Sequence, residues 1–207
     1  AITEGNSATF TVALAFIPNA DVTFNLVPSD SNKLSATDTG GTNATSLTFT
    51  PANYNQPQTV NVTALQDNDV TDETESIAIT DGNILSDQQV NISDDDTQAI
   101  TVTSVDVTGT EGTTTESFTV RLAFDPEGTV TLNLTSGDPA LATADTGGLN
   151  PATSLLFNGT NYSTPQTVSV NALHDNDLEN ETVDIMISDS ATTNPISSQS
   201  VSFTIED

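Results

Sequence analysis

Short segments in which hydrophobic and polar residues alternate follow one another along the whole chain. In the first half, Val, Leu, Ile, Phe and Ala take the alternating positions within residues 10–16, 22–26, 47–49, 60–64, 77–79 and 90–92. A period of two turns one face of a segment toward a core and the other toward solvent, which is typical of half-buried β-strands. We find no convincing helical stretch, so the pattern predicts an all-β fold.

The second half of the chain repeats the first. The repeated segments are 53–60 and 161–168, 64–69 and 172–177, 4–5 and 111–112, and 38–41 and 145–148. The offset is 107 or 108 residues throughout, which indicates a duplicated domain rather than chance similarity.

Each copy is predicted to form a β-sandwich. Seven short strands per copy, divided by Pro, Gly, Asn and Asp, are typical of the immunoglobulin-like fold. The second copy also has a leading strand around 100–107, of which the first copy keeps only a stub at Ile2. We therefore predict two tandem immunoglobulin-like Greek-key β-sandwiches, residues 1–96 with a truncated first strand and residues 97–207. Because the chain begins abruptly at Ala1, we expect it to be a piece of a longer protein.

Composition adds a strong negative charge to this picture. The 207 residues include 29 Asp and Glu against only Lys33 and Arg121, so the net charge is −27. We expect no nucleic-acid partner and no binding to a bare anionic membrane, because both require a basic face. No apolar run approaches the ~20 residues of a membrane-spanning helix, so no direct membrane insertion is expected.

Eight acidic positions recur in both copies. They are Glu4/Glu111, Asp30/Asp138, Asp38/Asp145, Asp67/Asp175, Asp69/Asp177, Glu73/Glu181, Asp81/Asp189 and Asp94/Asp207. Consecutive connections of an antiparallel sandwich alternate between its two ends, so seven of the eight positions are predicted to gather at one end. The exception is the pair Asp81 and Asp189, and Asp30 and Asp138 are expected mainly to cap turns.

Such a cluster needs a cation. Two carboxylates ~4 Å apart repel by about 1 kcal/mol in water, and by several times more where the effective dielectric constant is lower. Calcium takes roughly 6–8 oxygen ligands in a flexible geometry, whereas magnesium prefers fewer protein ligands and zinc prefers Cys or His. The loops do not follow the EF-hand pattern, because the later glycine and the terminal glutamate are out of place after Asp67-Asn68-Asp69. The residues therefore favour Ca²⁺ in a site of another kind.

The order of these motifs resembles the Calx-beta domain, which occurs in sodium–calcium exchangers and in large bacterial surface proteins. The matching features are Glu-Gly at 4–5, Asp67-Asn68-Asp69 followed by Glu73-Thr74, and the exit Ile92 to Asp96; the segment 47–60 is most similar to the bacterial branch. The resemblance covers nearly the whole chain, twice. It implies calcium ligands in copy one at Glu4, Asp38, Asp67, Asp69, Glu73, Asp94, Asp95 and Asp96, and in copy two at Glu111, Asp145, Asp175, Asp177, Glu179, Glu181 and Asp207.

Two features depart from the family pattern. Asn68 and Asn176 separate aspartates that are often adjacent in the family, which leaves the number of ions per site open. Copy two ends at Asp207, so its exit triplet is incomplete in this chain.

The leading interpretation is non-enzymatic: a calcium-dependent structural and adhesive repeat of a secreted or surface-anchored bacterial protein. Calcium would tie the loop after residue 64 to the exit at Asp94 and stiffen the link to the neighbouring repeat. One alternative is a module that recognises a glycan or a surface protein through loops at the other end, near Tyr54 and Tyr162; another is a regulatory calcium sensor. The repeated Asp-Thr-Gly at Asp38 and Asp145 does not predict an aspartic protease, because no apolar strand precedes it and Gly follows it.

Overall fold

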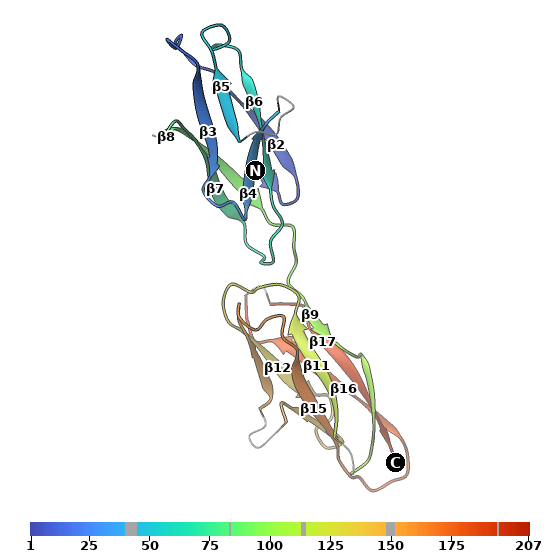
Figure 1. Cartoon of the computed structure of the whole chain (residues 1–207). Helices are drawn as coiled ribbons and strands as arrows, with labels where there is room; N and C mark the ends of the chain where they lie inside the picture. Colours follow the sequence, from blue (N-terminus) through green and yellow to red (C-terminus); the bar gives the residue numbers. More distant parts are fainter. Residues whose placement is uncertain (40–44, 83, 113–114, 148–151, 194) are drawn as a thin grey trace. The chain divides into compact units, whose positions relative to one another are not determined.

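The computed structural model describes residues 1–39, 45–82, 84–112, 115–147, 152–193 and 195–207, and the chain divides into two compact units, Ala1–Asp95 and Asp96–Asp207 (Figure 1). Every regular element in these ranges is a β-strand. Each unit is an immunoglobulin-like β-sandwich, which confirms the predicted fold class. The described ranges contain no helix with the length and hydrophobicity needed to span a membrane.

The described residues of unit 1 form eight strands in two sheets. They are β1 (Ile2–Thr3), β2 (Ser7–Val12), β3 (Val22–Pro28), β4 (Leu34–Asp38), β5 (Ser46–Phe49), β6 (Gln58–Ala64), β7 (Glu73–Thr80) and β8 (Ile84–Ser93). One sheet has the order β1-β8-β7-β3-β5 and the other β2-β6-β4. All neighbouring strands are antiparallel except β1 and β8, which run parallel.

Unit 2 repeats this arrangement with one strand more. Its strands are β9 (Ile100–Val102), β10 (Asp106–Thr110), β11 (Thr115–Leu122), β12 (Val130–Ser136), β13 (Ala142–Asp145), β14 (Ser154–Phe157), β15 (Gln166–Ala172), β16 (Glu181–Asp189) and β17 (Gln199–Glu206). The sheets have the orders β10-β17-β16-β12-β14 and β13-β15-β11-β9.

Each unit has its own hydrophobic core between its sheets. In β6, for example, Val60, Val62 and Ala64 are buried, while the residues between them are partly exposed. The predicted alternation therefore holds in the strands that build the core. It fails after β2, where Phe16 lies outside the strand and is 84% exposed.

The structure adds a strand to each copy that the sequence pattern did not predict. Leu34 and Ala36 are buried and alternate with Ser35 and Thr37, so residues outside the predicted strands form β4, and β13 is its counterpart. The signal was weak because small alanine side chains carry most of the apolar face. In the motif Asp-Thr-Gly-Gly, Gly40, Gly41 and Gly148 lie outside the described residues.

The two sandwiches differ at one sheet edge. In unit 2, β9 pairs with β11, and Ile100 is buried opposite Leu122. The described part of unit 1 has no counterpart of β9 beside β2. A groove lies there instead, lined in part by Phe10, Val12 and Leu14.

Filling this groove with a strand is expected to stabilise unit 1. A chain extended before Ala1 by a copy of residues 99–107 would carry an isoleucine to the position over Leu14. Burying an isoleucine side chain stabilises by about 1.5–3 kcal/mol, so the melting temperature of unit 1 should rise by roughly 10 °C in thermal unfolding. The matched control is the same extension with asparagine in place of that isoleucine; equal melting temperatures for the two extensions would contradict the expectation.

Candidate metal centre

Segments far apart in the sequence meet at one end of unit 1. The backbone N–H of Glu4 donates to Ser93 O at 3.0 Å, which ties the end of β1 to the end of β8. The backbone N–H of Leu65 donates to Lys33 O at 2.9 Å, which ties the β3–β4 connection to the β6–β7 connection. We call this region the acidic end of unit 1, because it gathers Glu4, Asp67, Asp69, Glu73 and Asp94.

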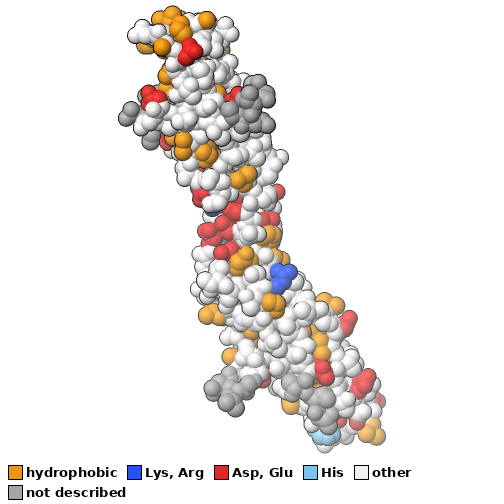
Figure 2. Space-filling model, viewed as in Figure 1, with side chains coloured by type: hydrophobic (Ala, Val, Ile, Leu, Met, Phe, Trp, Pro, Cys, Tyr) orange, Lys and Arg blue, Asp and Glu red, His pale blue; other side chains and the backbone are white. Residues whose placement is uncertain are grey.

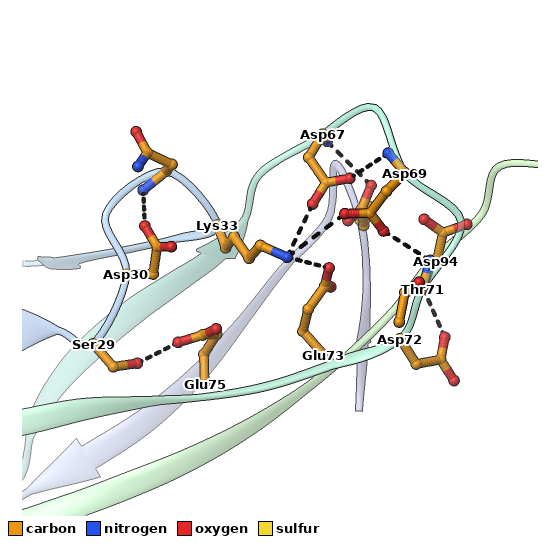
Figure 3. Close-up of polar contacts among 12 residues, drawn as sticks. Ser29, Asp30, Lys33, Asp67, Asp69, Thr71, Asp72, Glu73, Glu75 and Asp94 are labelled. Carbon is orange, nitrogen blue, oxygen red and sulfur yellow. Dashed lines mark hydrogen bonds and ion pairs between the residues drawn. The ribbon is translucent and has the colours of Figure 1, made fainter. Parts of the chain in front are cut away.

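Local side-chain to backbone bonds shape the Asp-Asn-Asp loop. Asp67 Oδ1 accepts the backbone N–H of Asp69 at 3.0 Å, and Asp69 Oδ1 accepts that of Thr71 at 2.8 Å. Two such turns in series use one oxygen of each aspartate, which is how Asp folds a turn on its own backbone. The second oxygens, both Oδ2, point toward one place (Figure 3).

That place holds the ammonium group of Lys33. Its Nζ lies 2.6 Å from Glu73 Oε1, 3.5 Å from Asp67 Oδ2 and 3.7 Å from Asp69 Oδ2 (Figure 3). The hydrogen bond to Glu73 raises the pKa of Lys33, so the side chain is a cation at neutral pH. The sequence pattern did not predict a cationic side chain in this cluster, and the structure places Lys33 there.

Glu4 is the most buried carboxylate of the acidic end, with 2% of its surface exposed. Its Oε2 accepts the backbone N–H of Asp67 at 3.4 Å. The pKa of Glu4 is raised to about 7, mainly by burial and in smaller part by the charges of Asp67 and Asp94, while the hydrogen bond from Asp67 opposes the rise. Gly5 follows with φ +69°, a conformation that L residues rarely adopt, which explains the glycine of the repeated Glu-Gly motif.

The carboxylates of unit 1 form two overlapping groups that share Asp67. In the group Glu4, Asp67 and Asp94, and in the group Asp67, Asp69 and Glu73, ligand oxygens lie within 4.8 Å of one another. Oxygens on opposite sides of a calcium ion are about 5 Å apart, so both groups fit this ion in size. Asp67 Oδ2 and Glu73 Oε2 are buried without a hydrogen-bond partner among the described residues, which leaves them able to ligate.

One such group lies among the described residues of unit 2. Oxygens of Asp175, Asp177 and Glu181 lie within 4.8 Å of one another, on a loop with the same two turns. Burial raises the pKa of Glu181, and the charges of Asp175 and Asp177 raise it further. No Lys or Arg forms an ion pair with these carboxylates within the ranges that the structure describes.

Glu111, the counterpart of Glu4, is 8% exposed and accepts the backbone N–H of Asp175. His174 Nδ1 lies 2.9 Å from Glu111 Oε1, on a side chain that is 78% exposed. His174 therefore lies at the surface and contacts the buried glutamate.

The structure does not bring Asp38 and Asp145 to the acidic ends. Asp38 pairs with Val60, and Val60 lies four residues, about 13 Å, before Ala64 at the acidic end of β6. Asp145 pairs with Ser169 in β15 and closes a turn by accepting the backbone N–H of Gly147 at 2.6 Å. The predicted position of both residues is corrected, because the unpredicted strands β4 and β13 carry them toward the opposite end.

The remaining predicted ligands lie outside the three compact groups. Asp95 Oδ1 accepts a hydrogen bond from Gln66 Nε2 at 2.9 Å, and Asp96 begins unit 2. Glu179 contributes its backbone N–H to the turn at Asp177. The backbone N–H of Asp207 donates to Asn180 Oδ1 at 3.1 Å, as that of Asp94 donates to Asp72 Oδ1 at 2.9 Å, so the two exits are built alike.

The turn residues behave as expected. Asp30 Oδ1 accepts the backbone N–H of Asn32 at 2.8 Å, and Asp138 Oδ1 accepts that of Ala140 at 2.9 Å. Both aspartates therefore cap turns.

This chain was compared with known protein families, curated proteins and solved structures, and only solved structures are similar to it. The chain matches no family model and no curated protein. Among solved structures it is similar to domains 4 and 5 of the S-layer protein SbsC, with 16% identity, a TM-score of 0.43 and coverage of 89% of this chain and 70% of that one. It is also similar to SbsC domains 1–6 (15%, TM-score 0.43, 88% and 20% coverage) and to the calcium binding domain CBD12 of CALX1.1 (18%, TM-score 0.34, 90% and 75% coverage).

The strand orders of the two units confirm the immunoglobulin-like fold that the Calx-beta resemblance implies. The bacterial branch stays a prediction from the sequence.

Proposed function

We propose that this chain is a calcium-binding β-sandwich repeat and that the acidic end of each unit holds the ion. The observation that carries the proposal is the group Asp175, Asp177 and Glu181, whose oxygens lie within 4.8 Å of one another with no cationic side chain paired to them in the described ranges. Glu73 supports it in unit 1, because its side chain is only 10% exposed and its Oε2 is buried without a hydrogen-bond partner among the described residues.

The chemistry of the donors selects the ion. All the candidate ligands are carboxylate oxygens, which suit a hard cation, and two overlapping groups that share Asp67 suit the high and flexible coordination number of calcium. In unit 1 the residues that would hold it are Asp67 with Glu4 and Asp94, or Asp67 with Asp69 and Glu73. A bound ion would tie the β6–β7 loop to the ends of β1 and β8.

The role that we propose is structural and adhesive, not enzymatic. Calcium sites built on exposed loops are consistent with a secreted or surface-anchored bacterial protein. Extracellular modules bind calcium at roughly 10⁻⁴–10⁻³ M. The net charge of −27 disfavours nucleic acid as a partner, and on the face drawn in Figure 2 blue Lys and Arg side chains are few. The partners we propose are calcium and further repeats of the same protein, with a glycan or surface protein as the adhesive target.

A calorimetric titration with calcium tests the assignment in unit 2. The double variant Asp175→Asn/Asp177→Asn is expected to lose one binding event, because it removes two of three charged ligands. The matched control, Asp106→Asn/Asp184→Asn, neutralises two exposed carboxylates outside the group and should bind as the wild type does. Equal heats for the wild type and the first variant would refute the site.

A further inference from the structure

The two units place different residues at the same point of the acidic end. Lys33 O accepts the backbone N–H of Leu65 at 2.9 Å, and Leu141 O accepts that of Leu173 at 2.8 Å. Lys33 and Leu141 each stand immediately before the first residue of the pairing strand, β4 or β13. They are therefore structural equivalents, one cationic and one apolar.

We infer that Lys33 is a built-in counter-cation of unit 1, which makes unit 2 the calcium-dependent unit of the pair. This inference rests on the proposed function, and it concerns how the calcium sites of the two units differ. In unit 1 the ammonium group contacts all three carboxylates of the group Asp67, Asp69 and Glu73. In unit 2 the group Asp175, Asp177 and Glu181 has no equivalent cation, because Leu141 stands there.

Lys33 and a calcium ion cannot share the group of Asp67, Asp69 and Glu73. The ammonium nitrogen lies 2.6–3.7 Å from the three carboxylates, in the position from which an ion would bind them. Calcium binds such oxygens at roughly 2.3–2.6 Å, so it would come within contact distance of a like charge. Calcium must therefore expel Lys33 from this group and break its hydrogen bond to Glu73.

The second group of unit 1, Glu4 with Asp67 and Asp94, does not restore the calcium affinity that unit 1 loses through Lys33. Glu4 and Asp94 form this group only together with Asp67, whose Oδ2 is 3.5 Å from the ammonium nitrogen. A calcium ion held there remains close to a positive charge. Unit 1 should accordingly keep its fold without calcium and bind the ion more weakly than unit 2.

Exchanging the two residues tests the inference in the full chain. Each unit has a single tyrosine, Tyr54 or Tyr162, and the chain has no tryptophan, so Tyr→Phe in one unit leaves tyrosine fluorescence as a reporter of the other. In these backgrounds Lys33→Leu should lower the calcium-free melting temperature of unit 1 and raise its calcium affinity by at least about tenfold. Leu141→Lys should weaken calcium binding by unit 2 by a similar factor.

The second cation of the chain provides the control. Arg121→Gln removes the same charge outside both groups and should leave both calcium affinities unchanged. Calcium affinities that stay unchanged in both exchange variants, while the wild type binds calcium, would overturn the inference and leave the proposed function intact. If Lys33→Leu fails to fold, Leu141→Lys decides alone. Absence of calcium binding in every variant would overturn the proposed function and the inference together.

Discussion

Calcium at a hundredfold excess over its dissociation constant is expected to raise the melting temperature of unit 2 by about 10 °C or more. A ligand at that excess which binds only the folded state stabilises it by about 2.7 kcal/mol. One kcal/mol corresponds to about 4–8 °C for a domain of 60–100 residues and to less for a larger one. Differential scanning calorimetry of the full chain in calcium and in chelator measures the shift.

The size of this effect follows from the charges at the acidic end. Asp175, Asp177 and Glu181 repel one another in the ion-free protein, and burial of Glu181 makes its ionisation less favourable. Calcium reverses both effects, because it pairs with the ionised carboxylates. The variant Asp175→Asn/Asp177→Asn should therefore show no shift. Melting temperatures that are equal in calcium and in chelator would contradict the account.

The calcium-free protein is expected to lose stability as the pH rises from about 4.5 to about 7. Burial raises the pKa of Glu4 from 4.5 to about 7 in the folded protein. The folded state therefore binds the proton more tightly than the unfolded chain over this range, so the free energy of unfolding decreases as the proton is lost. The shift corresponds to about 3 kcal/mol for a side chain that is 2% exposed.

Urea unfolding of unit 1 in calcium-free buffer at pH 5 and pH 7.5 measures this loss. Tyrosine fluorescence in the Tyr162→Phe background isolates the unit 1 transition. Glu4→Gln cannot ionise and should remove most of the difference between the two pH values. A difference of equal size in the wild type and in Glu4→Gln would assign the pH dependence to other groups.

Much of the fold could be predicted because the alternation of hydrophobic and polar residues occurs in both copies of the domain. Strands with large apolar side chains, such as β6 with Val60 and Val62, stand out by their period of two. The strand Leu34–Asp38 was missed because Ala36 contributes little hydrophobic signal and Asp38 is typical of a turn. That single omission displaced Asp38 and Asp145 in the predicted site, since β4 and β13 begin at the acidic end and carry these two residues away from it.

The candidate site could be predicted only as far as its motifs are local. The turns at Asp67 and Asp69 use neighbours in sequence, so the Asp-Asn-Asp loop and its copy were found directly. Lys33 precedes Asp67 by 34 residues, and only the pairing of β4 with β6 brings the two together. The contact of Lys33 with Glu73 depends on the tertiary structure, so the net charge of the chain could not predict it.

Nuclear magnetic resonance of the ¹⁵N-labelled full chain during a calcium titration tests the central claim most directly. The account predicts that backbone amide signals of residues 65–73 and 173–181 shift, together with those of Glu4 and Glu111, and that residues 173–181 respond at lower calcium. Signals at the opposite ends, such as those of Asp38 and Asp145, should stay in place. Spectra unchanged up to ~10 mM calcium, well above the range of extracellular modules, would contradict the account, as would shifts confined to those opposite ends.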